Sequence, residues 1–257
     1  METLIYHTEN RIAYVTLNRP EKRNALNALL VQELLQVFDD AENDPHVAVV
    51  VVKANGEAFC AGADLGYLQE LQNFSFDENV KDSTRLKELF YRIYTLKKIV
   101  IAQVQGHALA GGCGLANVCD FTFSAPEAKF GYTEVKIGFI PAIVMVFLIR
   151  KIGEARAKQL LLSGDLISAD DARQLGLVHN VFHRDSLEKE VTLFATKLAT
   201  TNSGNSMMMT KQMVAQIQSM PLEEALTYAA QMNVAARGTD DCKKGIAAFL
   251  NKEKIAW

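Results

Sequence analysis

The sequence predicts an α/β protein that continues into a helical C-terminal part. Short runs rich in Val, Ile and Thr, typical of buried strands, alternate with segments whose apolar residues recur at helical spacing. A glycine-containing loop begins where each of these strands ends, and from about residue 141 nearly every segment has a helical pattern. The 257 residues are enough for one sizeable core with a small appendage.

The expected elements follow one another with few interruptions. Strands are expected at residues 12–18, 47–54, 99–106, 121–124, 129–132 and 178–182. Helices are expected at residues 25–41, 78–96, 169–175 and 222–237. The second of these helices carries a stripe of apolar side chains at helical spacing: Leu86, Leu89, Phe90, Ile93 and Leu96.

Local signals mark the ends of two of the helices. Ser168 precedes one of them with Asp171 three residues later, which resembles a capping box, and Gly176 stops it. The last helix is framed by Pro221 at its start and Gly238 at its end.

Composition and charge argue against several classes of function. The chain is 49% hydrophobic and has 27 Lys+Arg against 30 Asp+Glu, so it lacks the positive field that holds nucleic acid or an anionic membrane. It has no apolar run of ~18 residues, which a membrane-spanning helix needs, and its first residues do not resemble a secretion signal. Its four cysteines lack paired CxxC spacing. We therefore expect a cytoplasmic protein without a metal site.

A first informative segment covers residues 56–65 and leads from a buried strand into a helix. Its small residues Ala61, Gly62 and Ala63 allow another molecule to approach the main chain closely, and the helix start adds unpaired N–H groups. Taken alone, the segment is as readily an ordinary turn between a strand and a helix.

A second segment, residues 105–115, again leads from strand to loop to helix. Gly106 and Gly111 have the spacing of a phosphate-binding loop, but Gly112 and Cys113 stand where that motif needs Lys and then Ser or Thr. A GxGxxG motif is also missing, so a dinucleotide-binding fold has little support. Two turns that each offer an N–H group are instead what an oxyanion hole requires.

The third segment, residues 128–141, contains one acid, Glu134, between a short strand and a following helix. In an arbitrary protein such a residue is usually a solvated loop carboxylate. Placed beside the two amide-bearing turns, it becomes a candidate proton carrier whose pKa would be raised by apolar surroundings.

These three segments, in this order, resemble the crotonase, or enoyl-CoA hydratase/isomerase, superfamily. The stretches RPEKRNALN (residues 19–27) and LLLSGDLISADDARQLGLVHNVF (residues 160–182) strengthen the resemblance, which covers essentially the whole chain. It implies a crotonase-type spiral of ββα turns over residues 1–195 and a helical trimerisation region over residues 196–257, with trimers commonly paired into hexamers. The implied substrate is an acyl-CoA thioester, so coenzyme A is part of the substrate and no separate cofactor is expected.

The resemblance also implies roles for individual residues. The backbone amides of Ala63 and Gly111 would form the oxyanion hole and hold the enolate of the thioester. Contacts with CoA are implied for Lys22, Ala61, Asp64 and Leu65, with Phe249 and Lys252 reaching the CoA of a neighbouring subunit.

The chain departs from the family pattern at two places. Hydratases of the family usually carry two catalytic glutamates; Glu134 matches the second, whereas Gly114 stands at the first. After Pro141, where many relatives have a glycine-rich helix start, this chain has the apolar run AIVMVF, so the acyl pocket is expected to differ in shape.

Four functions therefore stay open. The first is hydration of a 2-enoyl-CoA, short or branched and methylglutaconyl-like, by Glu134 alone or with Tyr132 or His107 holding the water. The second is Δ3,Δ2-enoyl-CoA isomerisation by the single carboxylate, and the third is non-catalytic binding of acyl-CoA. A cysteine hydrolase using Cys113 or Cys60 with His107 has the least support, because no Asn or Asp partner can be assigned.

Overall fold

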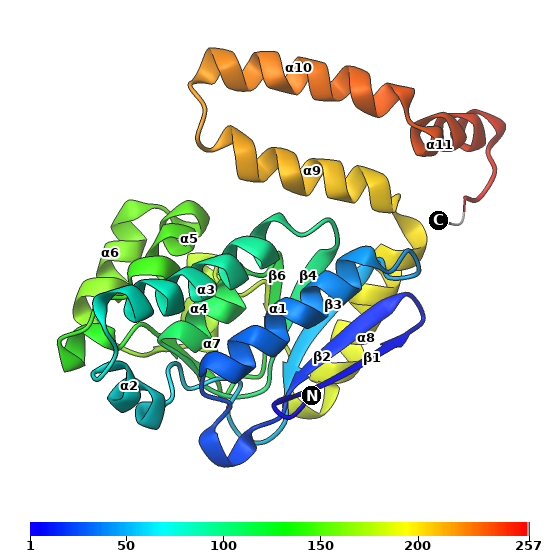
Figure 1. Cartoon of the computed structure of the whole chain (residues 1–257). Helices are drawn as coiled ribbons and strands as arrows, with labels where there is room; N and C mark the ends of the chain where they lie inside the picture. Colours follow the sequence, from blue (N-terminus) through cyan, green and yellow to red (C-terminus); the bar gives the residue numbers. More distant parts are fainter. Residues whose placement is uncertain (256) are drawn as a thin grey trace.

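Six strands form the main sheet of the computed structural model, which describes residues 1–255 and 257 (Figure 1). Their order across the sheet is β1, β2, β3, β4, β6 and β9, and every neighbouring pair is parallel except β1 with β2. The strands are β1 (Leu4–Glu9), β2 (Ile12–Leu17), β3 (Val49–Ala54), β4 (Ile99–Val104), β6 (Phe121–Ser124) and β9 (Asn180–Val181). The predicted strands are thereby confirmed within a few residues at their ends.

Strand β1 is the one member of this sheet that the sequence did not predict. Most of its residues are exposed, so it lacks the apolar run of a buried strand. It reverses into β2 through Asn10 and Arg11, whose φ values are 50° and 65°. Both positions of a tight hairpin turn can have positive φ, but the usual Asn-Gly signature is missing here.

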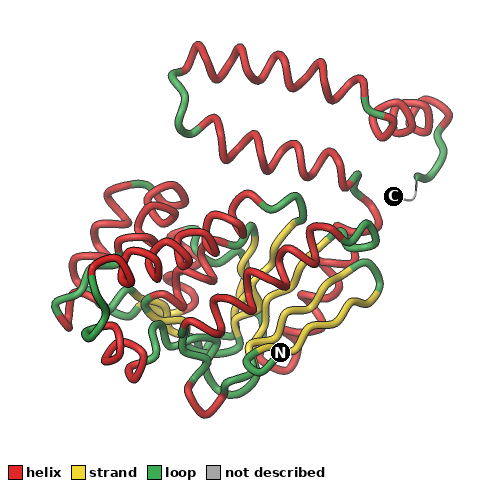
Figure 2. Tube along the Cα trace, viewed as in Figure 1, coloured by secondary structure: helices red, strands yellow, loops and turns green. Residues whose placement is uncertain are grey.

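The sheet is buried on both faces, which explains why β3 reads as a continuous run of valines. Val50 and Val52 pack with helices α1 (Ala28–Asn43) and α3 (Phe76–Thr95) on one face. Val49 and Val51 pack with α8 (Arg184–Thr201) on the other. Figure 2 shows the strands enclosed between these helices.

A smaller three-stranded sheet lies beside the main one and carries most of the candidate site. Its strands are β5 (Ala108–Leu109), β7 (Lys129–Gly131) and β8 (Ile167–Ser168). Around it lie the short 3-10 helices η1 (Pro20–Lys22) and η2 (Glu134–Ile137) and the helices α2 (Leu65–Leu71), α4 (Gly111–Val118), α5 (Ala142–Ile152), α6 (Glu154–Ser163) and α7 (Ala169–Leu175). The capping box of Ser168 and Asp171 at the start of α7 is present as predicted.

Three further helices form an arm that extends away from the sheets (Figure 1). They are α9 (Gly204–Ile217), α10 (Leu222–Gly238) and α11 (Asp240–Asn251). Among the described residues α10 buries none of its side chains, although it carries Leu222, Leu226 and Val234. The predicted boundary at residues 195 and 196 falls inside α8, and that division of the chain stays a prediction.

The arm is fastened to the core by one buried lysine of α9. The Nζ atom of Lys211 donates to the carbonyl oxygens of Ile93 at 3.1 Å and Lys98 at 3.0 Å, and to Oδ2 of Asp120 at 2.7 Å. The same carboxylate oxygen accepts from the backbone nitrogen of Val100 at 2.7 Å. This ion pair therefore links α9 to the segment that follows α4.

Within the described part of the chain, each helix is too short or too polar to cross a lipid bilayer.

We expect Lys211→Met to lower the free energy of unfolding by about 3 kcal/mol, because it leaves the Asp120 carboxylate buried without its partner. Lys243→Met is the matched control, since Lys243 and Asp240 form an exposed pair 3.7 Å apart that should contribute about 1 kcal/mol or less. Urea unfolding at a fixed protein concentration measures both. Equal losses in the two variants would contradict this assignment.

Candidate active site

Three chain segments run parallel at one edge of the small sheet and leave it in the same direction. Cys60 pairs with Ala108 in an isolated parallel bridge, and Ala108 pairs with Phe130 in the parallel ladder of β5 and β7. Continuing three residues from Cys60 and Ala108 leads to Ala63 and Gly111, and four residues from Phe130 lead to Glu134. The register of these pairings therefore brings together residues from three distant parts of the sequence.

Glycines allow the first two segments to pack backbone against backbone. A Cβ atom on Gly106 would lie 1.7 Å from the carbonyl oxygen of Glu57, and one on Gly112 would lie 2.2 Å from that of Cys60. A Cβ atom on Gly62, whose φ is +93°, would lie 2.8 Å from the Cβ of Ala110. Any larger side chain would force the turns apart, because such distances are far inside van der Waals contact.

The backbone amides of Ala63 and Gly111 lie next to each other as a result. A Cβ atom on Gly62 would lie 3.5 Å from the nitrogen of Gly111. Leu26 hydrogen-bonds to both peptide groups of Ala63: its nitrogen donates to the carbonyl oxygen of Gly62 at 2.7 Å, and its carbonyl oxygen accepts from the nitrogen of Asp64 at 2.8 Å. Since successive N–H groups of extended chain alternate in direction, the N–H of Ala63 points away from Leu26.

Neither amide has a protein acceptor within residues 1–255 and 257. Gly111 is the first residue of α4, where a helix leaves its N–H groups unpaired, and the preceding Ala110 has φ 51° and ψ −126°. A non-glycine residue with positive φ is strained, and such strain is typical of functional sites. Each of the two amides is thus free to donate to an acceptor outside the chain.

Two side chains that the sequence analysis did not single out, Arg19 and Asn24, fix the loop that carries Ala63 by hydrogen bonds. The Arg19 guanidinium donates to Oδ2 of Asp64 at 2.9 Å and to the carbonyl oxygen of Ala25 at 2.6 Å. The fully buried Asn24 amide donates to the carbonyl oxygens of Asn55 and Ala58, both at 2.9 Å. Asn24 stands in the RPEKRNALN stretch that the sequence analysis quoted. Its role could not be predicted, because its two acceptors lie more than thirty residues away in the chain.

Glu134 is the buried acid of the site. It is the first residue of η2, its side chain is only 8% exposed, and Oε2 is buried without a hydrogen-bond partner among the described residues. Burial raises the pKa of its carboxyl above the ordinary 4.5. The expected effect of apolar surroundings on this carboxyl is therefore present.

Tyr132 and Cys113 are neighbours of Glu134 and are fully buried. Burial, followed by the neighbouring Cys113 and Glu134, raises the pKa of Tyr132 well above its ordinary value. Burial also raises the pKa of the Cys113 thiol to about 12. These two groups are therefore neutral neighbours of Glu134, and the Tyr132 hydroxyl, like Oε2 of Glu134, is buried without a hydrogen-bond partner among the described residues.

The same observations oppose a cysteine nucleophile. Burial raises the pKa of Cys60 to about 12 as well, whereas a nucleophilic cysteine needs a lowered pKa. His107 is exposed, and its Nδ1 accepts from the backbone nitrogen of Lys129 at 3.3 Å. Among the described residues no three His, Cys, Asp or Glu side chains gather as they would around a metal ion.

Gly114 lies on the face of α4 that packs against α5. A Cβ atom there would lie 2.2 Å from Cγ1 and 2.8 Å from Cβ of Val144, and 3.1 Å from the ring of Phe90. The place of a side chain at residue 114 is therefore already filled by hydrocarbon. The sequence showed the missing acid but not that its space is closed.

The predicted CoA-contacting residues divide into two groups. Ala61, Asp64 and Leu65 flank the Ala63 amide along the chain. Lys22 precedes Arg23, whose carbonyl oxygen accepts from the Ala61 nitrogen at 3.0 Å. Lys22 and Leu65 are exposed at this rim. Asp64 also caps α2 by accepting from the backbone nitrogen of Gly66 at 2.9 Å. Phe249, which is 82% exposed, and Lys252 lie on α11 or at its end, and Figure 1 shows that helix at the opposite end of the molecule from α2.

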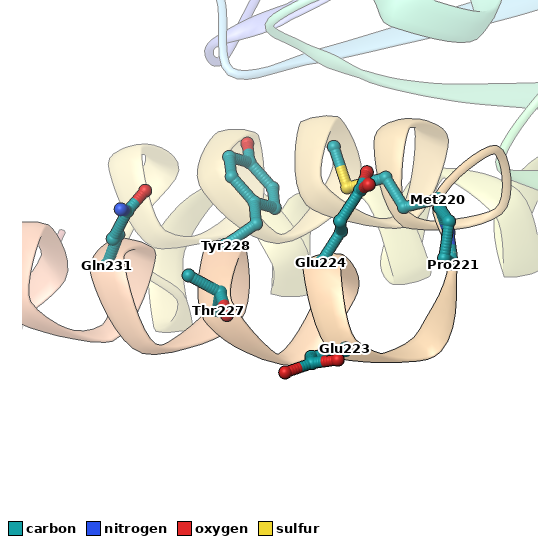
Figure 3. Close-up of a pocket in the computed structure, with 7 residues that line it drawn as sticks. All are labelled: Met220, Pro221, Glu223, Glu224, Thr227, Tyr228 and Gln231. Atoms are coloured by element: carbon teal, nitrogen blue, oxygen red, sulfur yellow. The ribbon is translucent and has the colours of Figure 1, made fainter.

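Two surface hollows lie outside the three parallel segments. The one drawn in Figure 3, of ≈ 370 Å³, lies on the arm between Met220 and Gln231. The other, of ≈ 490 Å³, lies along α3 from Phe76 to Lys87 and reaches Ile143 of α5. Neither hollow is lined by any of the predicted site residues.

The chain is similar to known proteins over nearly its whole length. Residues 7–257 match the family model described as enoyl-CoA hydratase/isomerase. A Thermus thermophilus protein with a provisional enoyl-CoA hydratase name is 43% identical over 95% of this chain and 96% of its own length. The 2,3-dehydroadipyl-CoA hydratase of Escherichia coli is 35% identical over 98% of this chain and 97% of its own. The solved enoyl-CoA hydratase of Mycobacterium smegmatis superposes with a TM-score of 0.92 at 30% identity, covering 99% of this chain and 98% of that one.

We expect Gly112→Ala to reduce any activity that depends on the two amides by about 100- to 1000-fold, because the new methyl group pushes the segments of Cys60 and Ala110 apart. Gly204→Ala is the control, since a Cβ atom there meets nothing within 4 Å. Steady-state kinetics on folded protein measure both. Full activity in Gly112→Ala would show that the close approach does not position the amides.

Proposed function

Because the chain belongs to the enoyl-CoA hydratase/isomerase family, we propose that it hydrates a 2-enoyl-CoA thioester by way of an enolate. The observation that supports this proposal is the strand register, which directs the unpaired amides of Ala63 and Gly111 and the segment that carries the buried Glu134 to one edge of the small sheet. The thioester oxygen binds between the two N–H groups. As negative charge develops on that oxygen, each donor stabilises the transition state, typically by a factor of about 100 to 1000.

Glu134 moves the proton in this scheme. Its carboxylate takes a proton from water while the water oxygen bonds to C3 of the substrate, and the C2–C3 double bond electrons pass into the enolate. The carboxylic acid then returns a proton to C2 as the enolate collapses to the thioester. A carboxyl whose pKa is raised toward neutrality suits both steps, because it can be base and acid in turn.

The binding of CoA is proposed on the rim formed by Lys22, Ala61, Asp64 and Leu65. The exposed ammonium of Lys22 supplies a positive charge for the phosphates, and the half-buried Ala61 offers close access to the main chain. Coenzyme A enters and leaves with the acyl group, so the scheme needs no further cofactor.

The acyl group is proposed to be short or branched, of the methylglutaconyl type. Support comes from the AIVMVF run, which begins α5 and brings Val144 to the wall at Gly114. Further support comes from a relative, 35% identical, that is named 2,3-dehydroadipyl-CoA hydratase, because a dehydroadipyl group carries a second carboxyl.

Self-association into a trimer or a pair of trimers is proposed for the arm. Leu222, Leu226 and Val234 of α10 are 77%, 62% and 67% exposed, which is unusual for so many large apolar side chains on one helix. Phe249 and Lys252, which lie far from their own Glu134, would then be available to the CoA of a neighbouring subunit.

An isomerase is the second candidate, and the closed place at Gly114 favours it. One carboxylate suffices to carry a proton between C2 and C4 of a 3-enoyl-CoA, with the same enolate on the same two amides. A purely acyl-CoA-binding protein has less support, because a buried carboxyl without a partner destabilises the fold and is of no use to binding alone.

We expect Glu134→Gln to lower the rate of hydration by about 100- to 10,000-fold, because it removes the group that carries the proton. The assay incubates 2-enoyl-CoA thioesters and, in parallel, their 3-enoyl isomers with enzyme in ¹⁸O-labelled water and identifies the products by mass. Labelled 3-hydroxyacyl-CoA from the wild type supports hydration. Unlabelled 2-enoyl-CoA formed from the 3-enoyl isomer, without any hydrated product, would establish the isomerase instead.

The same variant should be more stable than the wild type at neutral pH. Because the pKa of Glu134 is raised in the folded protein, the stability that its protonated form contributes is fully present below the unfolded value near 4.5 and is lost as the pH rises through the raised value. Thermal midpoints of Glu134→Gln should therefore exceed those of the wild type at about pH 8. The midpoints should converge below the unfolded value of 4.5. A Glu134→Gln variant that is less stable at the higher pH would contradict the burial of this carboxyl.

A further inference from the structure

We propose that Val144 limits this active site to a single carboxylate, because it occupies the space that an acidic side chain at residue 114 would need. The inference rests on the proposed function, because it concerns how many acids can reach the enolate. It starts from Gly114, which lies on α4 about one helical turn after Gly111.

The place of a side chain at residue 114 is closed by α5 and α3 together. The Cγ1 and Cβ atoms of Val144 stand 2.2 Å and 2.8 Å from the position of a Cβ atom on Gly114, and the Phe90 ring stands 3.1 Å from it. A distance of 3.1 Å can be relieved by a small shift of the ring, whereas the two valine distances cannot be. Val144 is therefore the obstacle, and Phe90 is a minor one.

Val144 cannot move aside easily, because α5 is fixed against α4. Val144, Leu148 and Ile152 form a buried stripe along α5. At the far end of that stripe the Nζ atom of Lys151 donates to the carbonyl oxygens of Asn117 at 2.7 Å and Cys119 at 3.0 Å, which end α4. A valine in a helix also has essentially one side-chain rotamer. The wall is thus a rigid part of the fold.

A carboxylate introduced at residue 114 alone would meet this hydrocarbon without a partner, and an unpaired buried charge is strongly destabilising. Residues 114 and 144 are therefore coupled, and one substitution cannot convert the site to the two-acid form. With Val144 in place, Glu134 alone has to perform both proton transfers: it takes a proton from the attacking water and returns a proton to C2.

The coupling is tested with five variants. Three are the single substitutions Gly114→Glu, Val144→Gly and Val146→Gly, and two combine Gly114→Glu with each glycine variant. Val144→Gly removes both close atoms. Val146→Gly is the matched control, because Val146 lies on the same helix with 52% of its surface exposed, so it adds the cost of a helical glycine without opening the wall.

Thermal unfolding gives the first readout and does not need activity. Val144→Gly should lower the melting temperature of the wild type, because it leaves a cavity, and raise that of Gly114→Glu, because it relieves the clash. Val146→Gly should lower the melting temperature in both backgrounds. If Val144→Gly also lowers the melting temperature of Gly114→Glu, the proposal is wrong.

Hydration of an unbranched 2-enoyl-CoA gives the second readout. Gly114→Glu with Val144→Gly should be at least tenfold faster than Gly114→Glu with Val146→Gly. Equal rates in the two double variants would overturn the proposed role of Val144. Full hydration by Glu134→Gln in the otherwise wild-type chain would instead refute the proposed function, so the two failures are distinguishable.

Discussion

The whole site depends on the parallel contact between the segments that begin at Cys60 and Ala108. Their backbones approach so closely that Gly106 and Gly112 have no room for a side chain. Because the hydrogen bonds of the ladder fix the register, the direction in which each segment leaves the sheet is fixed too. Two amides from turns almost fifty residues apart in the chain are preorganised in this way, before any ligand binds.

The fold provides this rigidity at identifiable costs. Ala110 holds a positive φ beside Gly111, and Glu134 buries one oxygen without a partner. Both features destabilise the folded chain locally, and in the proposed reaction both have a role, since the amides then hold a thioester oxygen and the carboxyl a water molecule. The buried apolar core of β3, β4, α1 and α3 stabilises the folded chain and so offsets these local costs.

Much of the fold followed from sequence patterns, because its signals are local. The strands with apolar runs and the helix start at Ser168 are set by periodicity and capping, and the structure confirms them. The hairpin of β1 escaped prediction because Asn10 and Arg11 lack a glycine signature. The isolated bridge at Cys60 and the two-residue strand β5 escaped because they are too short to produce a pattern.

The candidate site was predictable as a set of residues through family resemblance, but its geometry was not. The sequence shows directly that residue 114 is a glycine and not an acid. It does not show that Val144, thirty residues further along the chain, occupies the space beside Gly114, because this depends on how α5 packs on α4. The supporting contacts of Arg19 and Asn24 are likewise tertiary, since their partners at Asp64, Asn55 and Ala58 lie far away in the chain.

The most direct test of the central claim is the infrared carbonyl stretch of a 2-enoyl-CoA thioester bound to the protein. Two N–H groups from Ala63 and Gly111 should shift this stretch to lower frequency than in water, and the shift should persist in Glu134→Gln, where binding occurs without turnover. A stretch at the frequency found in water, with the thioester fully bound, would show that these amides do not hold the reacting oxygen.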